Sequence, residues 1–117
     1  MDKIYLIHQW DTDYYKIGYT RGSVTKRLKT LQTGTPNELT VVSFYESDYA
    51  KLIESTFHRL HKTRKINGEW FDLPNEFIKN FKDECLKIEE NFKHLEEHNI
   101  YFQKERKSHK HLTKKFF

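Results

Sequence analysis

Three side chains of the segment LIESTFHRLH could bind a metal ion or a phosphate. Glu54, His58 and His61 are four and three residues apart, so on a helix they would share one stripe. A carboxylate there is an oxygen ligand for a hard divalent cation, and a histidine one turn on could orient the carboxylate or a phosphate. One glutamate and two histidines could equally bind zinc. A solvated polar stripe without any ligand is the third interpretation, and the spacing alone leaves all three open.

Arg27 is a candidate for binding an anion. It follows Val24 and precedes Leu28 and Leu31, whose spacing predicts the buried stripe of a short helix. At 3.6 residues per turn Arg27 lies about 60° from the centre of that stripe. It could therefore extend into a cleft beside a sheet, or lie along the surface as an ordinary arginine.

Tyr5 and Lys16 belong to two neighbouring strand-like segments, KIYLIH and YYKIGYT. Side chains alternate with period two along a strand, so the two residues could lie at matching depth on one face. A cation beside a tyrosine favours its phenolate, and we therefore expect the pKa of Tyr5 to lie below its usual value of about 10. Ordinary aromatic packing beside a free lysine is the alternative.

The elements that would position these residues follow an α+β pattern. Three segments have the alternation or the β-branched and aromatic composition of strands: 3–8, 14–20 and 39–45. Three have the apolar spacing of helices: 23–32, 48–61 and 75–98. Between them, residues 62–74 resemble an irregular basic loop that ends in a short extended piece before Pro74. The sequence thus predicts a small three-stranded antiparallel sheet flanked by helices, plus a long C-terminal amphipathic helix.

Composition restricts the class of protein. The chain has 117 residues, of which 36% are hydrophobic and 15% aromatic, which suits one folded domain and argues against disorder. It has no apolar run of about 18 residues and no signal-peptide pattern at its start, so we expect an intracellular protein, cytoplasmic or nucleoid-associated, without a membrane partner. Cys85 is at a helical core position and is predicted to be a small buried hydrophobe.

The net charge of +4 is unevenly distributed. Residues 104–117 hold six basic residues and one acidic residue, whereas residues 72–103 hold four basic and eight acidic residues. A basic end suits a polyanionic partner. His109 and His111 in it could bind a metal, but a solvated basic end is the simpler interpretation. Only one alanine occurs in the chain. That scarcity suits an AT-rich genome such as that of a phage or a large virus, in which case the protein would act in the host cell.

Five segments taken together resemble the GIY-YIG nuclease superfamily, and more narrowly its T5orf172/Mug113-type branch. KIYLI, YYKIGYT, TKRLKTLQTGTP, LIESTFHRLH and NGEWF have the order and spacing of that branch over about residues 3–73. The resemblance implies a three-stranded sheet flanked by helices, with a site on one sheet face that cleaves phosphodiester bonds. It therefore implies an enzyme, a divalent-metal-dependent DNA endonuclease. A non-catalytic nucleic-acid-binding module on the same fold is the alternative, and a protein that only binds a partner through its acidic C-terminal helix is a third hypothesis.

The resemblance also implies roles for single residues. Tyr5 would activate the attacking water, directly or through the metal. Arg27 would stabilise the charge that grows on the phosphate. Glu54 would be the metal ligand, holding one Mg²⁺ ion, with Mn²⁺ as the other candidate. His58 would lie beside the metal or the phosphate.

Two residues of the second strand complete the implied site. Lys16 occupies the position at which the wider superfamily has a second tyrosine, and it would support Tyr5 as a phenolate or bind phosphate. Gly18 would keep the strand free of a side chain where the nucleic-acid backbone or a neighbouring helix comes close. Of the NGEWF segment, we expect Trp70 and Phe71 to pack over the sheet and Glu69 to be exposed.

The remaining expectations concern contacts and domain boundaries. Basic residues around the implied site are predicted to contact nucleic acid: Lys26, Lys29, Arg59, Lys62, Arg64 and Lys65. We expect residues 1–73 to form the nuclease core and residues 74–98 to form a helix packed on it or on a second copy in a homodimer. Residues 99–117 are predicted to be a flexible basic tail.

Overall fold

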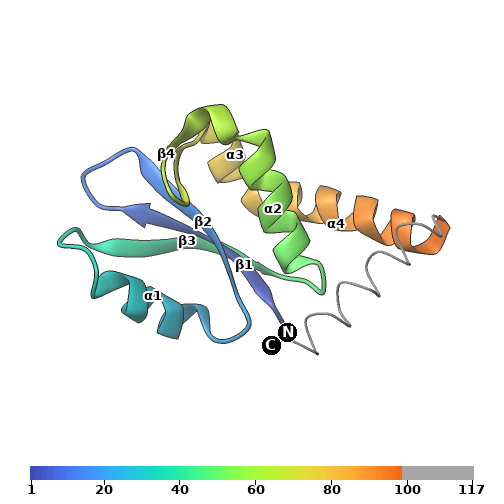
Figure 1. Ribbon diagram of the computed structural model, residues 1–117, viewed down its shortest axis with the longest axis horizontal. Coiled ribbons are helices and arrows are strands. Elements are labelled where there is room, and N and C mark those ends of the chain that lie inside the picture. Colours follow the sequence, from blue (N-terminus) through green and yellow to red (C-terminus); the bar gives the residue numbers. More distant parts are fainter. Residues whose placement is uncertain (99–117) are drawn as a thin grey trace.

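A computed structural model describes residues 1–98 of the chain (Figure 1). The predicted tail, residues 99–117, lies outside the described residues, and so do His109 and His111. One antiparallel sheet has the strand order β3-β1-β2-β5-β4. Its strands are β1 (Lys3–Gln9), β2 (Tyr14–Thr20), β3 (Leu39–Glu46), β4 (Lys65–Asn67) and β5 (Trp70–Asp72). The helices are α1 (Val24–Gln32), α2 (Ala50–Leu60), α3 (Asn75–Lys79) and α4 (Phe81–His98), with a 3₁₀ turn over Lys62–Arg64.

The predicted α+β class is confirmed, but the sheet has five strands where the sequence led us to expect three. The two additional strands come from residues 62–74, which had the composition of an irregular loop. Gly68, with a φ of 55°, makes the turn between β4 and β5, a conformation that glycine adopts without steric cost. β5 then pairs with β2. Trp70 and Phe71 are therefore part of the sheet itself, and their side chains pack into the cores on its two faces.

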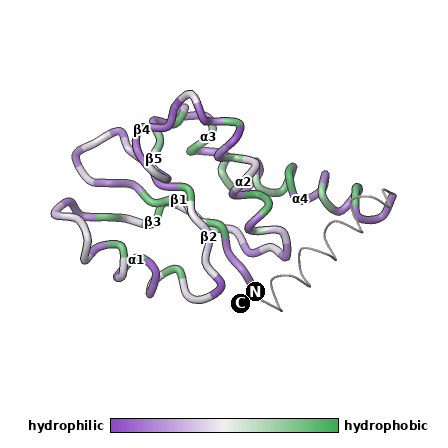
Figure 2. The backbone as a smooth tube through the Cα atoms, viewed as in Figure 1, coloured by the Kyte–Doolittle hydropathy of each residue, from purple (hydrophilic) through white to green (hydrophobic). Residues whose placement is uncertain are grey.

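β1 is the centre of the fold and is buried on both faces. Ile4 and Leu6 pack on one face with residues of α2, α3 and α4, whereas Tyr5 and Ile7 pack on the other face under α1. Figure 1 shows α1 on one side of the strands and α2, α3 and α4 on the other. The tube in Figure 2 is hydrophobic along β1, as expected for a strand covered on both faces.

The predicted helix over residues 75–98 is interrupted. The backbone N–H and the side-chain amide of Asn80 both donate to the carbonyl of Glu76, at 3.1 and 3.0 Å, and α4 begins at the next residue. The buried residues Phe77, Phe81 and Cys85 keep a four-residue spacing across this break, so the apolar pattern concealed it. Cys85 is buried as predicted, and burial raises the pKa of its thiol. The first half of α4 therefore packs on the core.

One further boundary differs from the prediction. α2 begins at Ala50, two residues later than predicted, because the Ser47 hydroxyl accepts the backbone N–H of Tyr49 and holds the chain in a turn before the helix. Within residues 1–98, no helix combines the length and the apolar character needed to cross a membrane.

Candidate active site

The candidate site lies at an edge of β2 that β5 leaves unpaired. β5 pairs with β2 over Tyr14, Tyr15 and Lys16 and then turns away. We call the side of Gly18–Thr20 that no strand of residues 1–98 covers the open edge of β2; just before it, the Ile17 N–H still donates to the Glu69 carbonyl at 3.3 Å. At its start the Ile17 carbonyl lies 2.8 Å from Nε2 of His58 on α2. A carbonyl oxygen only accepts, so this nitrogen carries the hydrogen. α2 is thus held over the open edge, where its side chains can reach toward the α1 face of the sheet.

Gly18 makes room for the ring of Tyr5. The two residues are directly opposite each other in the β1–β2 register. A Cβ atom at Gly18 would overlap the Cζ and Oη atoms of Tyr5. The sequence had led us to expect the nucleic-acid backbone or a helix as the close neighbour. Within the described chain that neighbour is the Tyr5 ring, so any larger residue at this position would displace it.

Arg27 of α1 reaches the same ring from the opposite side. Its Nε donates to the Tyr5 hydroxyl at 3.4 Å, which places Arg27 in the site and not along the open surface. Tyr5 has no exposed area, and burial raises its pKa, whereas the hydrogen bond and charge of Arg27 act to lower it. The expectation of a lowered pKa is therefore wrong, because burial outweighs the neighbouring cation. The hydrogen bond to Tyr5 in turn raises the pKa of Arg27.

Lys16 is a buried cation with two partners from the β4–β5 turn. It is two residues before Gly18, so its side chain lies on the same sheet face as Tyr5. The residue is 8% exposed, and its Nζ lies 2.5 Å from Oε2 of Glu69 and 5.7 Å from the centre of the Trp70 ring. The Glu69 side chain keeps 41% of its area exposed but is part of the site. Sequence reasoning missed this role, and the only local signal for it was Gly68 before an alternating Glu-Trp-Phe segment.

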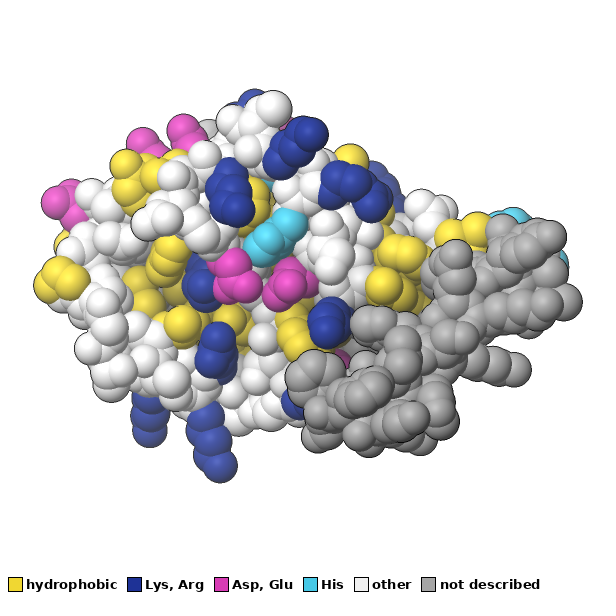
Figure 3. All heavy atoms as spheres, viewed as in Figure 1, with side chains coloured by type: hydrophobic (Ala, Val, Ile, Leu, Met, Phe, Trp, Pro, Cys, Tyr) yellow, Lys and Arg dark blue, Asp and Glu magenta, His cyan; other side chains and the backbone are white. Residues whose placement is uncertain are grey.

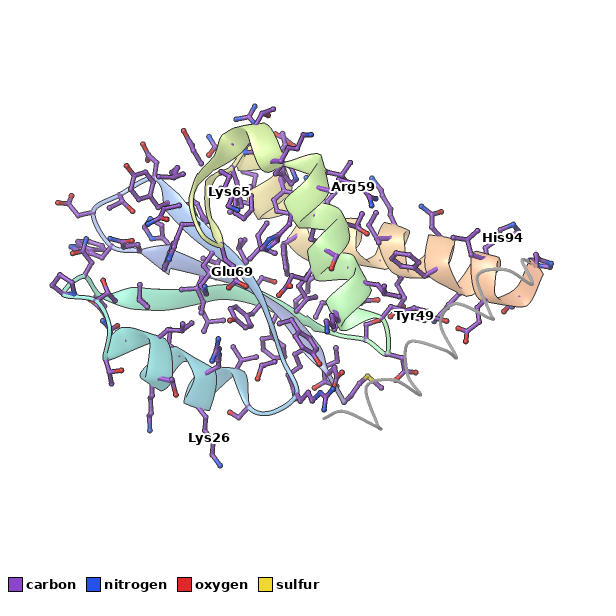
Figure 4. All side chains as sticks on the ribbon, in the orientation of Figure 1. Lys26, Tyr49, Arg59, Lys65, Glu69 and His94 are labelled. Atoms are coloured by element: carbon purple, nitrogen blue, oxygen red, sulfur yellow. The ribbon has the colours of Figure 1, made fainter. Side chains whose placement is uncertain are left out.

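Glu54 faces the same group of charges from α2. It is half-buried, and its pKa is raised first by burial and then by the negative charge of Glu69. Positive charge on His58, Lys16 and Lys51 acts in the opposite direction. In Figure 3, two acidic side chains lie beside a histidine in the middle of the visible face, with lysine and arginine side chains around them. Figure 4 shows Glu69 between α1 and α2.

His61 does not join this group. Its ring lies 4.5 Å from the ring of Phe77, and burial lowers its pKa. The stripe of one glutamate and two histidines that the spacing allowed is therefore not assembled. Among residues 1–98, no three His, Cys, Asp or Glu side chains are grouped as a metal site.

The donor set fits a magnesium-type ion better than zinc. Glu54 and Glu69 supply carboxylate oxygens, and Mg²⁺ is commonly bound by one or two carboxylates together with water. Structural and catalytic zinc sites need three or four protein ligands, mostly thiolates and imidazoles. No cysteine is near, and the His58 nitrogen named above is already bonded to a backbone carbonyl.

The residues predicted to contact nucleic acid are all exposed, and they fall into two groups. Lys26 and Lys29 are on α1, and Figure 4 shows Lys26 pointing away from the sheet. The others continue from the end of α2 into β4: Arg59, Lys62, Arg64 and Lys65. Figure 4 shows Arg59 and Lys65 on that side of the molecule, across Glu69 from Lys26. The site thus lies between two basic surfaces.

Comparison with known proteins gives one finding. A family model described as the T5orf172 domain matches residues 2–89, from β1 into α4 and past residue 73, where the resemblance ended. No curated protein and no solved structure matches the chain.

Proposed function

The chain belongs to the T5orf172 domain family, and from this premise we propose that it is a divalent-metal-dependent endonuclease that hydrolyses phosphodiester bonds in DNA. The observation that carries the proposal is the meeting of Tyr5, Arg27 and Glu54 from three separate elements, β1, α1 and α2. The GIY-YIG resemblance gives these three the roles of water activator, phosphate stabiliser and metal ligand. A fold that had lost this activity would have no need to keep all three in mutual electrostatic contact.

In this proposal Arg27 binds the phosphate. Only its Nε is used within residues 1–98, so its other N–H groups can donate to phosphate oxygens. A fixed guanidinium next to a buried phenol costs little reorganisation when negative charge grows on the phosphate, which is the condition for strong electrostatic stabilisation. The Lys16 ammonium adds positive charge on the same sheet face.

Tyr5 would accept a proton from the attacking water at its phenolate oxygen, once the phenol has released its own proton to solvent. Burial holds the phenol in its protonated form at neutral pH, so this step depends on positive charge beside the oxygen. Arg27 supplies that charge directly, through its hydrogen bond to the oxygen. Gly18 contributes by allowing the ring to lie against β2.

Glu54 would hold Mg²⁺ or Mn²⁺ through its carboxylate. Such an ion, when bound, would polarise the phosphoryl oxygen and stabilise the leaving group. The raised pKa of Glu54 indicates a carboxylate whose negative charge is poorly compensated. A bound cation would compensate that negative charge.

Cleavage of DNA tests the proposal. Purified protein is incubated with supercoiled, linear duplex and single-stranded DNA in Mg²⁺, in Mn²⁺ and in EDTA. We expect nicking or cutting with either metal, none in EDTA, and none in Glu54→Gln. Glu90→Gln, which changes an exposed glutamate on α4, is the matched control and should cleave like the wild type. Wild-type protein that leaves all these substrates intact with both metals would refute the nuclease proposal.

The second candidate is a nucleic-acid-binding module without cleavage. The burial of Tyr5 favours it, because a fully buried phenol with a raised pKa is a poor proton acceptor at neutral pH. This alternative is supported if the wild-type protein binds DNA without cutting it and Glu54→Gln binds equally well. An intracellular location, a viral origin and pairing of two copies through α4 remain predictions from the sequence.

A further inference from the structure

We propose that Glu69 is the second carboxylate of the cation site, opposite Glu54, and that the Lys16 ammonium fills this site as an internal counter-ion until a divalent ion displaces it. The identity of the ion, Mg²⁺ or Mn²⁺, rests on the proposed function. The assignment of Glu69 and Lys16 rests on the geometry of the β4–β5 turn.

Glu69 is held in place by the backbone on both sides. Gly68 before it has a φ of 55° and turns the chain sharply, and Trp70 after it is paired with Lys16. Its own carbonyl accepts the N–H of Ile17 at 3.3 Å. The carboxylate is therefore anchored to the strand that carries Lys16, at the beginning of the open edge of β2.

Glu54 has no donor that satisfies its charge. Within residues 1–98 it makes neither a hydrogen bond nor an ion pair, although it is half-buried. Water still reaches its oxygens, but partial burial disfavours the charged form, and a second carboxylate nearby disfavours it further. Two carboxylates brought to one place from different elements, one of them without a protein donor, form an acceptor set suited to a divalent cation.

Lys16 supplies one positive charge to this set. Its side chain is nine-tenths buried, and its ion pair is with Glu69 and not with Glu54. A divalent ion shared by both carboxylates would repel the ammonium at this short range. Lys16 would then leave Glu69 and become available to a phosphate. The metal and the lysine thus compete for Glu69, whereas in an ordinary structural ion pair Lys16 and Glu69 would only support each other.

Competition predicts effects of opposite sign at the two residues. Binding of Mn²⁺ to the full chain is measured by isothermal titration calorimetry at pH 7.5 without DNA. We expect Glu69→Gln to weaken Mn²⁺ binding by about tenfold or more, since one of two carboxylate ligands is lost. Lys16→Gln should strengthen it several-fold, because the competing cation is removed. Glu54→Gln should abolish it.

Matched controls use exposed residues of α4, Glu90→Gln and Lys87→Gln, which should leave Mn²⁺ affinity unchanged. Far-ultraviolet circular dichroism and urea unfolding establish that each variant is folded, and Lys16→Met replaces Lys16→Gln if the latter is not. If neither Lys16 variant folds, the Mn²⁺ affinity of Glu69→Gln by itself tests whether Glu69 is a ligand of the ion. The inference is overturned if Glu69→Gln binds Mn²⁺ within twofold of the wild type, if removal of the lysine weakens binding, or if the wild type binds no Mn²⁺.

These outcomes are separate from those of the cleavage experiment. Mn²⁺ affinities of the expected pattern in a protein that never cuts DNA would retain the cation site and refute the nuclease. If cleavage requires Glu54 but Mn²⁺ affinity is unchanged in Glu69→Gln, the nuclease proposal is retained and the two-carboxylate cation site is refuted.

Discussion

Glu54 of α2 and Glu89 of α4 are both withdrawn from water, but their ionisation is shifted in opposite directions. Glu89 is 8% exposed and its pKa is lowered, whereas Glu54 is less deeply buried and its pKa is raised. Burial alone would raise both values. The difference therefore comes from the neighbours of each carboxylate.

Glu89 is surrounded by donors. Burial acts to raise its pKa, but hydrogen bonds from Ser47 and Tyr45 and the charge of Lys93 outweigh burial. The Tyr45 hydroxyl donates at 3.0 Å, and Lys93 lies 3.4 Å away on the next turn of α4. Burial, and then the hydrogen bond to Glu89, raise the pKa of Tyr45 to about 12. This network fastens α4 to the end of β3.

Glu54 has a second carboxylate where Glu89 has donors. The positive charge that acts on it comes from His58, Lys16 and Lys51, and of these Lys16 is paired with Glu69. A buried carboxylate whose donors are all in place has reached its final partners and stabilises the fold. One without donors retains the capacity to bind a ligand. In the proposal, Glu89 is therefore the structural glutamate and Glu54 the one that binds the ion.

A cation of the candidate site should affect catalysis, whereas a cation of the Glu89 network should affect stability. Arg27→Ala removes the guanidinium next to Tyr5, and we expect cleavage of DNA to fall by about 10²–10³-fold, the cost of losing one preorganised donor to a developing charge. Arg27→Lys should recover only part of this, because an ammonium cannot reproduce the Nε geometry. The measurement is kcat/KM for a duplex substrate in Mg²⁺.

Lys93→Ala is the matched change at the Glu89 network and should leave kcat/KM unchanged. The comparison fails if Arg27→Ala cleaves within a few-fold of the wild type, or if Lys93→Ala loses activity while remaining folded.

Most of the fold could be predicted because its longer elements carry their own periodicity. β1, β2, β3, α1 and α2 each have enough residues for an apolar pattern to be recognised. β4 and β5 have three residues each, too few to show alternation. They form because β5 pairs with the edge of β2. The break at Asn80 was concealed because the buried spacing continues through it.

The site was predictable where the resemblance named its residues, and unpredictable where pairing of distant strands decides it. Tyr5, Arg27, Lys16 and Glu54 do come together. Glu69 enters the site only through the β5–β2 register, which no local pattern in the sequence reveals. The direction of the Tyr5 pKa was wrong for a related reason, since the depth of burial depends on the whole fold.

The two glutamates should also differ in their contribution to stability. Glu89→Ala leaves the Tyr45 hydroxyl without its acceptor and should lower the free energy of unfolding by about 1–3 kcal/mol. Glu54→Ala removes a carboxylate that has no donor, and we expect a change of only about 0.5 kcal/mol in either direction. Urea unfolding at pH 7 in EDTA measures both. Equal losses in the two variants would mean that Glu54 is as structural as Glu89.

The smallest expected effect is in the acid dependence of stability. The pKa of Glu89 in the folded protein lies below its ordinary value of 4.5, so its contribution is present above pH 4.5 and is lost as the pH falls through the folded value. The folded pKa of Glu54 lies above 4.5, so its charge costs stability at neutral pH. That cost is recovered as the pH falls from the folded value toward 4.5. The two glutamates therefore oppose each other in mild acid.

Gln variants separate the two contributions. In EDTA, with the free energy of unfolding measured in urea between pH 7 and pH 3.5, Glu89→Gln should lose less stability on acidification than the wild type. Glu54→Gln should lose more, because the compensating gain above pH 4.5 is absent. Glu90→Gln, on the exposed side of α4, should follow the wild-type curve. If Glu54→Gln also follows it, the carboxylate of Glu54 is already satisfied in the folded protein, and the contrast with Glu89 on which the cation site depends does not exist.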